Sequence, residues 1–391
     1  MATDYFSKTS KILITCNPSI PPYLSRELTE LDYQTDKVDR LNVTTKGTLT
    51  DCIRLNYGLR TANRVFYKVG ELKVNKIDDL YSELYTIPWE ELIPAAGTFS
   101  VHSFVINDDV KDTRYPNLLA KDAVVDRIRK KTGSRPNSTS SRDFAGVYFY
   151  WTTDICEVFI DTSGETIAKH GYRENPFKAP LQEALASALL NETEWSEKER
   201  MINPMCGSGT FAIEAALKAR NIAPGRFRKN WAFMHLVGFR KKILVDVTNA
   251  FRRNEIEVEG VNIWASDISK QAVEAARTNA EHAGVSEHIH FEVIDFRKTT
   301  VPNGDGVVFM NPEYGERLGK DKDLEELYSE IGAFLKQKCT NKRAFVFSGN
   351  LDLVKSIGLK PSSKKLFYNA KIECRLLEYE LYEGSKKEKK N

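Results

Sequence analysis

From about residue 175 the chain alternates short apolar stretches with amphipathic helical patterns. After a helix that begins near Pro180 and a short strand that ends at Asn203, strands are expected at 261–267, 288–294, 306–310, 343–348 and 371–382, with helices at about 209–220, 269–283 and 322–337. This alternation is typical of a doubly wound, mostly parallel α/β sheet. Such sheets bind ligands at the carboxyl ends of their strands. Residues at strand ends are therefore the first candidates for chemistry.

The first 160 residues follow a different pattern, in which short strands and helices alternate as small α+β units. A long helix is expected from about Pro116 to Lys131, with Gly133 as its stop. The six cysteines show no CxxC spacing, which argues against a zinc site or a disulfide framework and fits a reducing compartment. No run of 18 apolar residues and no signal peptide pattern is present. We therefore expect a cytoplasmic protein of two or three domains, without a metal.

The net charge of +3 hides an uneven distribution along the 391 residues. The last seven residues, 385–391, hold four Lys and one Glu, which leaves 53 basic and 53 acidic groups elsewhere. A first basic island, residues 111–142, carries a net charge of +6, and a second, residues 218–253, carries +9. Two islands on a neutral chain favour a polyanionic partner at defined places, and solvated helix faces are the alternative. The candidate phosphate contacts are Arg127, Arg129, Lys130, Lys131, Arg135, Arg226, Arg228 and Lys229.

A glycine loop, Asn203-Pro-Met-Cys-Gly-Ser-Gly-Thr210, follows the first strand of the α/β part and opens a helix. Gly207 and Gly209 allow a ligand to approach the backbone closely. The loop lacks the Gly-Lys-Ser/Thr of a phosphate-binding P-loop and the third glycine of the dinucleotide fingerprint. By itself it is weak evidence, and a simple tight turn is the alternative.

The next two strands also end in groups that suit a nucleoside. Asp267, followed by Ile268, stands at the end of the second strand, where a carboxylate can accept hydrogen bonds from both ribose hydroxyls. At the end of the third strand, Asp295 can accept from an adenine amino group, and Phe296 can lie against the ring. Helix capping is the alternative for both carboxylates, although it explains three such strand ends less easily than one.

The fourth strand ends in Asn311-Pro-Glu-Tyr-Gly-Glu-Arg-Leu-Gly319. The exocyclic amine of a nucleobase is a poor nucleophile, because its lone pair is delocalised into the ring. The Asn311 side-chain oxygen and the Pro312 carbonyl can accept its two N–H groups and direct the lone pair at an electrophile. Tyr314 can stack on the extruded base. Positioning and electrostatics then supply the rate, without a metal or a covalent intermediate. A plain Asn-Pro turn is the alternative.

Taken together, the glycine loop and the Asn311–Gly319 motif resemble those of the THUMP-domain RNA guanine-N2 methyltransferases, above all the bacterial enzymes for large-subunit ribosomal RNA. The resemblance extends over most of residues 60–384. Further matching stretches are Asp161–Gly164, His170–Arg173, Ala179–Glu183, Leu185–Leu189, and Ile222–Gly225 continuing through Trp231–Phe233.

The resemblance implies S-adenosylmethionine as the methyl donor and RNA as the partner, with 23S ribosomal RNA ahead of tRNA. It implies a ferredoxin-like unit (1–60), a THUMP RNA-binding domain (61–164), a Rossmann-like methyltransferase domain (165–384) and a basic tail (385–391). The implied donor pocket consists of Pro180, Leu181, Asn203, Pro204, Cys206, Gly207, Ser208, Gly209, Asp267, Ile268, Asp295, Phe296 and Asn311, and the implied catalytic residues are Asn311, Pro312 and Tyr314. The extra length between Gly207 and Asp267 holds the second basic island, which we expect beside the active-site edge.

Two residues depart from the family pattern. The loop begins with Asn203 where the family usually has Asp, and Glu313 stands where the family has a second Pro. These departures leave room for an RNA-binding protein that has lost catalysis. A tRNA guanine-N2 methyltransferase is a second alternative. An NAD-dependent oxidoreductase fits less well, because the third glycine of its fingerprint is absent.

Overall fold

The computed structural model describes residues 4–107, 110, 112, 114–177, 180–258, 260, 262–314 and 321–382, without the side chains of residues 321 and 322. The basic tail lies outside the described residues, and so do Lys111, Ala179 and the 315–319 part of the Asn311 motif. The chain divides into two compact units. The first comprises residues 1–17, 24–168 and 224–253, and the second comprises 18–23, 169–223 and 254–391. Each unit is described by itself.

The first unit is built on an eight-stranded sheet. Its strands are β1 (Ser10–Thr15), β2 (Lys37–Val38), β3 (Asn42–Gly47), β4 (Arg64–Lys73), β5 (Thr98–Ile106), β6 (Asn137–Ser138), β7 (Ala145–Thr152) and β8 (Ile155–Asp161). Its helices are α1 (Pro21–Glu30), α2 (Leu49–Gly58), α3 (Ile77–Tyr85), α4 (Arg114–Thr132) and α7 (Lys241–Arg253), with the 3₁₀ turns η1 (Trp89–Glu91), η2 (Pro224–Phe227) and η3 (Ala232–His235). The strand order is β2-β3-β1-β4-β8-β7-β5-β6.

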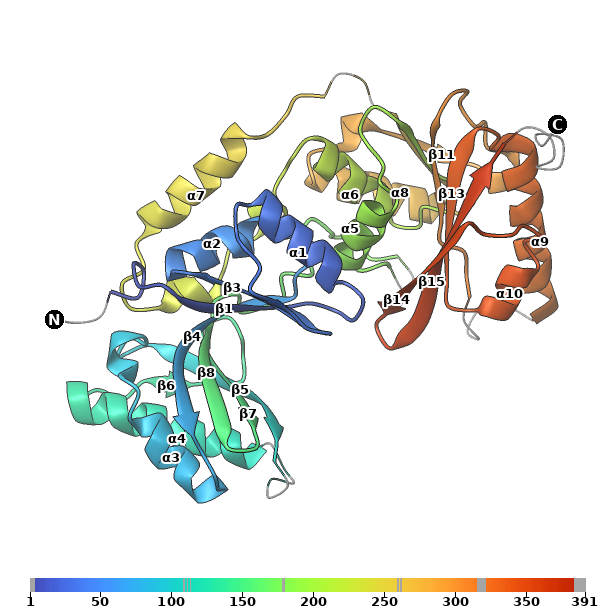
Figure 1. The fold of residues 1–391 in the computed structure, drawn as a ribbon. Coiled ribbons are helices and arrows are strands. Elements are labelled where there is room, and N and C mark those ends of the chain that lie inside the picture. The colour runs from blue at the N-terminus through green and yellow to red at the C-terminus, as the bar shows by residue number, and fades with distance from the viewer. Residues whose placement is uncertain are drawn as a thin grey trace. The chain divides into compact units, whose positions relative to one another are not determined.

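Strand β4 joins the two halves of this sheet. Its first residues pair with β1, and it pairs with β8 from Phe66 to Lys73. Helix α2 begins where Thr48 and Asp51 form a capping box, in which each side chain accepts the other's backbone N–H. Helices α3 and α4 lie side by side against the half that contains β5 and β7 (Figure 1).

The second unit is built on a seven-stranded sheet. Its strands are β9 (Arg200–Asn203), β10 (Ile263–Asp267), β11 (Ile289–Val293), β12 (Gly306–Met310), β13 (Lys342–Ser348), β14 (Ser363–Asn369) and β15 (Ile372–Leu381). Its helices are α5 (Glu183–Glu192), α6 (Thr210–Ala219), α8 (Lys270–His282), α9 (Asp321–Lys338) and α10 (Leu351–Lys355), with the 3₁₀ turns η4 (Ser286–His288) and η5 (Phe296–Lys298).

The strand order of the second sheet, β11-β10-β9-β12-β13-β15-β14, confirms the doubly wound fold. Strands β9 to β13 are parallel, and β15 and β14 are antiparallel additions at one edge. Chain order reverses between β9 and β12, which pair in parallel from Arg200 to Ile202 and from Gly306 to Val308. Ligands of such sheets bind at this topological switch point. Asn203 ends β9 and Asn311 follows β12, so both residues lie there.

Helices cover both faces of this sheet: α5, α6 and α8 lie on one side, and α9 and α10 on the other (Figure 1). All five residues of β12 are buried, as a central strand between two helix layers requires. On one face Phe211 of α6 stacks on Phe309, with ring centroids 3.5 Å apart. On the other face α9 packs on β12, β13 and β15 around Tyr328. A rigid core therefore supports the ends of β9 and β12.

The segment 224–253, which contains most of the second basic island, packs with the first unit rather than with the sheet that precedes it in sequence. Its backbone bonds to the end of β8, because Ala232 N–H donates to Ser163 O (3.3 Å) and Phe233 N–H donates to Thr162 O (3.2 Å). Helix α7 lies beside α2, where Phe251 contacts Tyr57 (Figure 1). The uninterrupted 165–384 domain and the other domain boundaries stay predictions.

Among the described residues, no helix combines the length and apolarity needed to cross a bilayer.

Candidate donor and acceptor sites at the sheet switch point

Asn203, the last residue of β9, links the two central strands. Its Nδ2 donates to the Phe309 carbonyl at 2.9 Å, whereas its Oδ1 is buried and meets no hydrogen-bond partner in the described part of the chain. An aspartate at this position has no amide hydrogen for the Phe309 carbonyl unless it is protonated. The asparagine therefore ties the glycine loop to the strand that carries Asn311 and still presents one acceptor oxygen.

The glycine loop needs both of its glycines. Gly207 has φ +54° and Gly209 has φ +82°, values that side chains disfavour. A Cβ on Gly209 would lie 2.8 Å from the Cβ of Ala276, so this residue packs directly on α8. A Cβ on Gly207 would meet nothing within 4 Å, which leaves open space over the loop. Ser208 Oγ is buried without a partner among the described residues. Pro204 and Cys206 are buried beneath the loop, and burial raises the pKa of the Cys206 thiol.

Asp267, at the end of β10, is tied to the glycine loop. Its Oδ2 accepts from Gly207 N–H at 3.0 Å, and its Oδ1 accepts from Ser269 N–H at 2.9 Å. The cap of α8 is Ser269, whose side chain accepts from Ala272 N–H. Each oxygen of a carboxylate can accept more than one hydrogen bond. Asp267 is partly exposed beside the exposed Ile268 and can still receive hydroxyl donors.

The two residues after β11 differ in their availability. Asp295 accepts from Arg297 N–H, caps the turn η5 and forms an ion pair with the Arg297 guanidinium, which lowers the pKa of Asp295. Phe296 is 7% exposed, and its ring meets Phe334 edge to face at 5.7 Å. The Phe296 ring thus belongs to the core around α9, while the Asp295 carboxylate stays partly exposed.

Asn311 follows β12 with its Oδ1 buried and without a hydrogen-bond partner within the described ranges. Pro312 is buried and Glu313 is exposed. A buried amide oxygen without a partner costs about 1–3 kcal/mol. Two such oxygens, Asn203 Oδ1 and Asn311 Oδ1, come from adjacent strands at the switch point. They mark a place that is built to receive hydrogen-bond donors.

Tyr314 is held by residues that the motif analysis did not identify. Its hydroxyl accepts from Asn369 Nδ2 at 2.8 Å, and its ring meets Phe347 edge to face at 6.3 Å. A Cβ on Gly349 would lie 2.8 Å from the ring, so only glycine leaves room for it. Burial raises the pKa of the Tyr314 hydroxyl. Asn369 lies on β14, a strand that the sequence pattern did not predict, so no local signal marked it.

The segment before α5 carries Pro180 and Leu181. The expected helix start at Pro180 is wrong by three residues, because α5 begins at Glu183. The physical reason is that the Leu181 carbonyl accepts from Arg173 Nη2 at 2.6 Å.

The eight candidate phosphate contacts lie in the first unit and fall into two groups. Arg127 forms a bidentate ion pair with Glu90, with both side chains under 20% exposed. Arg228 donates to the Ser163, Glu165 and Thr166 carbonyls, and burial lowers its pKa to about 10. Both guanidinium groups serve the fold. The remaining six are exposed: Arg129, Lys130, Lys131, Arg135, Arg226 and Lys229.

Comparison with known proteins gives the fold its class. No cluster of His, Cys, Asp or Glu in the described ranges can hold a metal ion. A solved structure of a provisionally assigned methyltransferase complexed with S-adenosylhomocysteine aligns with a TM-score of 0.87, at 26% identity, over 97% of this chain and 100% of that one. The fold is thus that of the Rossmann-like methyltransferases with an N-terminal α+β extension.

Family profiles and relatives give the identity within that class. The profiles match an RlmL ferredoxin-like domain at 11–66, a THUMP domain at 74–161 and an RMKL-like methyltransferase domain at 170–378. The chain belongs to the RMKL-like methyltransferase family. It is 31% identical to a provisionally named RNA methyltransferase of Synechocystis sp., over 97% of this chain and 99% of that protein. It is 34% identical to the ribosomal RNA large subunit methyltransferase K/L of Psychromonas ingrahamii, over 96% of this chain but only 50% of that protein's length.

Proposed function

We propose that this protein is an S-adenosylmethionine-dependent RNA methyltransferase that modifies the exocyclic N2 amine of a guanine in 23S ribosomal RNA. The observation that carries the proposal is the buried, unpartnered Asn311 Oδ1 at the end of β12. It lies on the strand next to the glycine loop, within a family of methyltransferases. The RNA class rests on the names of the relatives, and the choice of guanine N2 rests on the resemblance of the Asn311 motif.

The donor side fits S-adenosylmethionine on three counts. The space over Gly207 admits a ligand against the backbone, and Asp267 offers a partly exposed carboxylate for ribose hydroxyls. Asn203 Oδ1 offers a buried acceptor that suits an amino group. When bound, the donor supplies an electrophilic methyl group. The protein's residues hold and orient the donor and exclude water from it.

The acceptor side presents hydrogen-bond acceptors and one aromatic ring. Asn311 Oδ1 and the Pro312 carbonyl accept the two N–H groups of an amine and so direct its lone pair away from the base. Tyr314 presents a ring whose position Asn369 and Gly349 fix, and base stacking on such a ring contributes about 1–3 kcal/mol per base. Glu313 is exposed, and the proposed reaction assigns it no role.

The proposal is tested with purified protein and donor carrying a labelled methyl group. Four substrates are compared: 23S RNA and 16S RNA from a strain that lacks the gene, unmodified tRNA, and duplex DNA. We expect label in 23S RNA alone, and mass spectrometry of nuclease digests should assign it to N2-methylguanosine.

Other outcomes would redirect or end the proposal. Label in tRNA alone would favour the tRNA enzyme, and label in DNA would contradict the RNA class. A protein that binds RNA but transfers no label to any substrate would match the lapsed enzyme.

A further inference from the structure

Residues 173–182 form a segment without helix or strand that leads into α5 and carries Pro180 and Leu181, two of the candidate donor contacts. Such a segment has no ladder of backbone hydrogen bonds to fix it. Side chains from elsewhere in the second unit take over that task. Two of them, Arg173 and Asn279, account for most of the described side-chain bonds to it.

Arg173 joins this segment to the helix that follows the glycine loop. Its Nη2 donates to the Leu181 carbonyl at 2.6 Å and to Thr210 Oγ1 at 2.8 Å, and it lies 3.5 Å from Glu183 Oε1. Thr210 is the first residue of α6, directly after Gly209. The Arg173 side chain is 14% exposed, so water competes little for these bonds. One guanidinium thus holds the Leu181 backbone against the start of α6.

Asn279 joins the same segment to the glycine loop itself. It lies on α8 and is fully buried. Its Oδ1 accepts from the backbone N–H groups of Glu174 and Asn175, each at 3.0 Å. Its Nδ2 donates to the Asn175 carbonyl at 3.1 Å and to the Ser208 carbonyl at 3.2 Å. All four hydrogen-bonding positions of the amide are therefore in use, two in each direction.

Helix α8 supports the glycine loop at a second point, one turn before Asn279. Gly209 packs on Ala276 so closely that a Cβ would lie 2.8 Å away. Just before α8, Asp267 receives Gly207 N–H. The loop is thus held from residue 207 to residue 209 by groups on or next to α8. Asn279 is the group that also reaches the 173–182 segment.

We propose that Asn279 and Arg173 are positioning residues that set the affinity for the methyl donor by holding the 173–182 segment and the glycine loop in a fixed relation. The proposal rests on the donor site proposed above. Neither side chain is assigned a contact with the donor. Loss of either therefore weakens donor binding through the position of the Leu181 and Ser208 backbones.

The test uses Asn279→Asp in the full-length protein, with binding of S-adenosylhomocysteine measured by calorimetry. The carboxylate keeps the oxygen that accepts from Glu174 and Asn175 but turns a second oxygen toward the Asn175 and Ser208 carbonyls. We expect the affinity at pH 8 to fall at least tenfold relative to wild type. At pH 5.5 a protonated aspartic acid regains one O–H donor, so most of the loss should disappear. Wild type measured at both pH values corrects for any change in the ligand.

The matched control is Asn56→Asp in the first unit. Asn56 is 1% exposed and donates to the Cys52 carbonyl and to Thr162 Oγ1, so the same substitution disturbs an equally buried amide. We expect it to lower stability without changing the affinity for S-adenosylhomocysteine. Arg173→Lys is the second test variant, because a lysine keeps the charge but cannot reproduce the guanidinium geometry. We expect it to weaken binding about threefold while the protein stays folded.

The outcomes separate this inference from the proposed function. Wild-type binding that Asn279→Asp and Arg173→Lys both leave unchanged overturns the inference alone. Equal weakening by Asn279→Asp and Asn56→Asp also overturns it, because general loosening then explains the result. If wild type itself binds no S-adenosylhomocysteine, the donor site and the inference fail together.

Discussion

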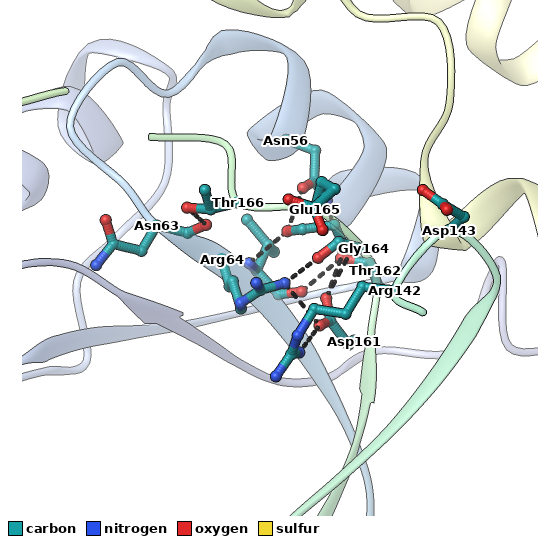
Figure 2. A network of polar contacts seen from close by, with 12 residues as sticks. Asn56, Asn63, Arg64, Arg142, Asp143, Asp161, Thr162, Gly164, Glu165 and Thr166 are labelled. Carbon is teal, nitrogen blue, oxygen red and sulfur yellow. Dashed lines mark hydrogen bonds and ion pairs between the residues drawn. The ribbon is translucent and has the colours of Figure 1, made fainter. Parts of the chain in front are cut away.

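The two units each contain a buried polar cluster, and the clusters differ in whether their hydrogen bonds are complete. In the first unit, Asp161 accepts from Arg64 and Arg142 through one carboxylate oxygen and from two backbone N–H groups through the other (Figure 2). In the second unit, Asn203 and Asn311 each keep an amide oxygen without a partner in the described chain. Both clusters contain residue types that occur in active sites. Complete hydrogen bonding indicates a structural role, and incomplete hydrogen bonding indicates a place for a ligand.

The closed cluster extends well beyond Asp161. Arg64 also donates to the Gly164 carbonyl, and Asn56 joins Thr162 and Ser163 through hydrogen bonds of 2.8 and 2.5 Å (Figure 2). Gly164 has φ +80°, and a Cβ there would lie 2.6 Å from the Arg142 carbonyl. The Asp161–Gly164 stretch therefore acts as a joint inside the first unit, where β8 ends and the 224–253 segment attaches.

The largest expected effect comes from opening the closed cluster with Asp161→Ala. Asp161 has a side chain only 3% exposed, and its removal leaves two arginines and two backbone N–H groups without their acceptor. Breaking a buried ion pair costs about 3–5 kcal/mol. We expect faster hydrogen exchange in β4 and β8, with β9 and β12 unchanged.

Asp39→Ala is the matched control for Asp161→Ala. Asp39 pairs with Lys37 on the surface, where both side chains are more than 40% exposed. Such pairs contribute about 0–1 kcal/mol. Equal exchange rates in the two variants would contradict the structural role of the Asp161 cluster.

The next effect concerns the open group. Asn311→Ala removes an acceptor that has no partner in the described structure, so the free energy of unfolding should not fall. Removing one positioned electrostatic group from an active site lowers kcat about 100-fold to 1000-fold. We expect a loss of this size in methyl transfer, with unchanged affinity for S-adenosylhomocysteine by calorimetry.

Asn56→Ala reverses these expectations, because the hydrogen bonds of Asn56 to Cys52, Thr162 and Ser163 serve the fold. It should lower the unfolding temperature and leave kcat unchanged. A variant of Asn311 that loses stability but keeps its rate would place Asn311 in the closed class.

Glu27 limits the comparison, because it leaves an oxygen unpartnered within the first unit. Its Oε2 accepts from Arg60 and Thr61 N–H, its Oε1 has no partner in the described chain, and burial raises its pKa from 4.5 to about 7. A raised carboxyl pKa means that the folded state holds its proton to higher pH than the unfolded state. Stability is therefore highest at low pH and falls between about pH 4.5 and 7.

A shift of this size predicts a loss of about 2 kcal/mol between pH 5 and pH 8. Glu27→Gln should remove that part of the pH dependence, as followed by urea unfolding of both proteins at the two pH values. Glu30→Gln, an exposed position on the same helix, is the control. If Glu27→Gln keeps the full wild-type loss, Glu27 is not the titrating group.

The sequence predicted the elements of the second unit well, because periodicity is a local property. The glycine loop and Asp267 meet through a 3.0 Å hydrogen bond, in keeping with their positions at neighbouring strand ends. The role of Asn203 was not predictable, since its partner Phe309 lies 106 residues away. Charge counting placed Arg228 in a basic island, but only the fold shows that three carbonyls surround it. Tertiary contacts thus decide which polar residues are available, and a single sequence does not encode them locally.

The smallest expected effect applies the comparison to the cations of α4. Lys131 is exposed, whereas Arg127, one turn away, is closed by Glu90. If α4 faces RNA phosphates as predicted, Lys131→Gln removes about one phosphate contact. The slope of log affinity against log salt should then decrease in magnitude by about 0.7–0.9. Binding weakens a few-fold for every RNA sequence, as filter binding over a salt series would measure.

Arg127→Gln provides the opposite case with the same product residue. It leaves Glu90 without its bidentate partner, so we expect lower stability and an unchanged salt slope. Steeper dependence on Arg127 than on Lys131 would mean that the Glu90 pair opens to receive RNA, and that a closed pair in the free protein does not exclude a role in binding. An unchanged slope in both variants would move the RNA surface away from this end of α4, toward exposed cations such as Arg226 and Lys229.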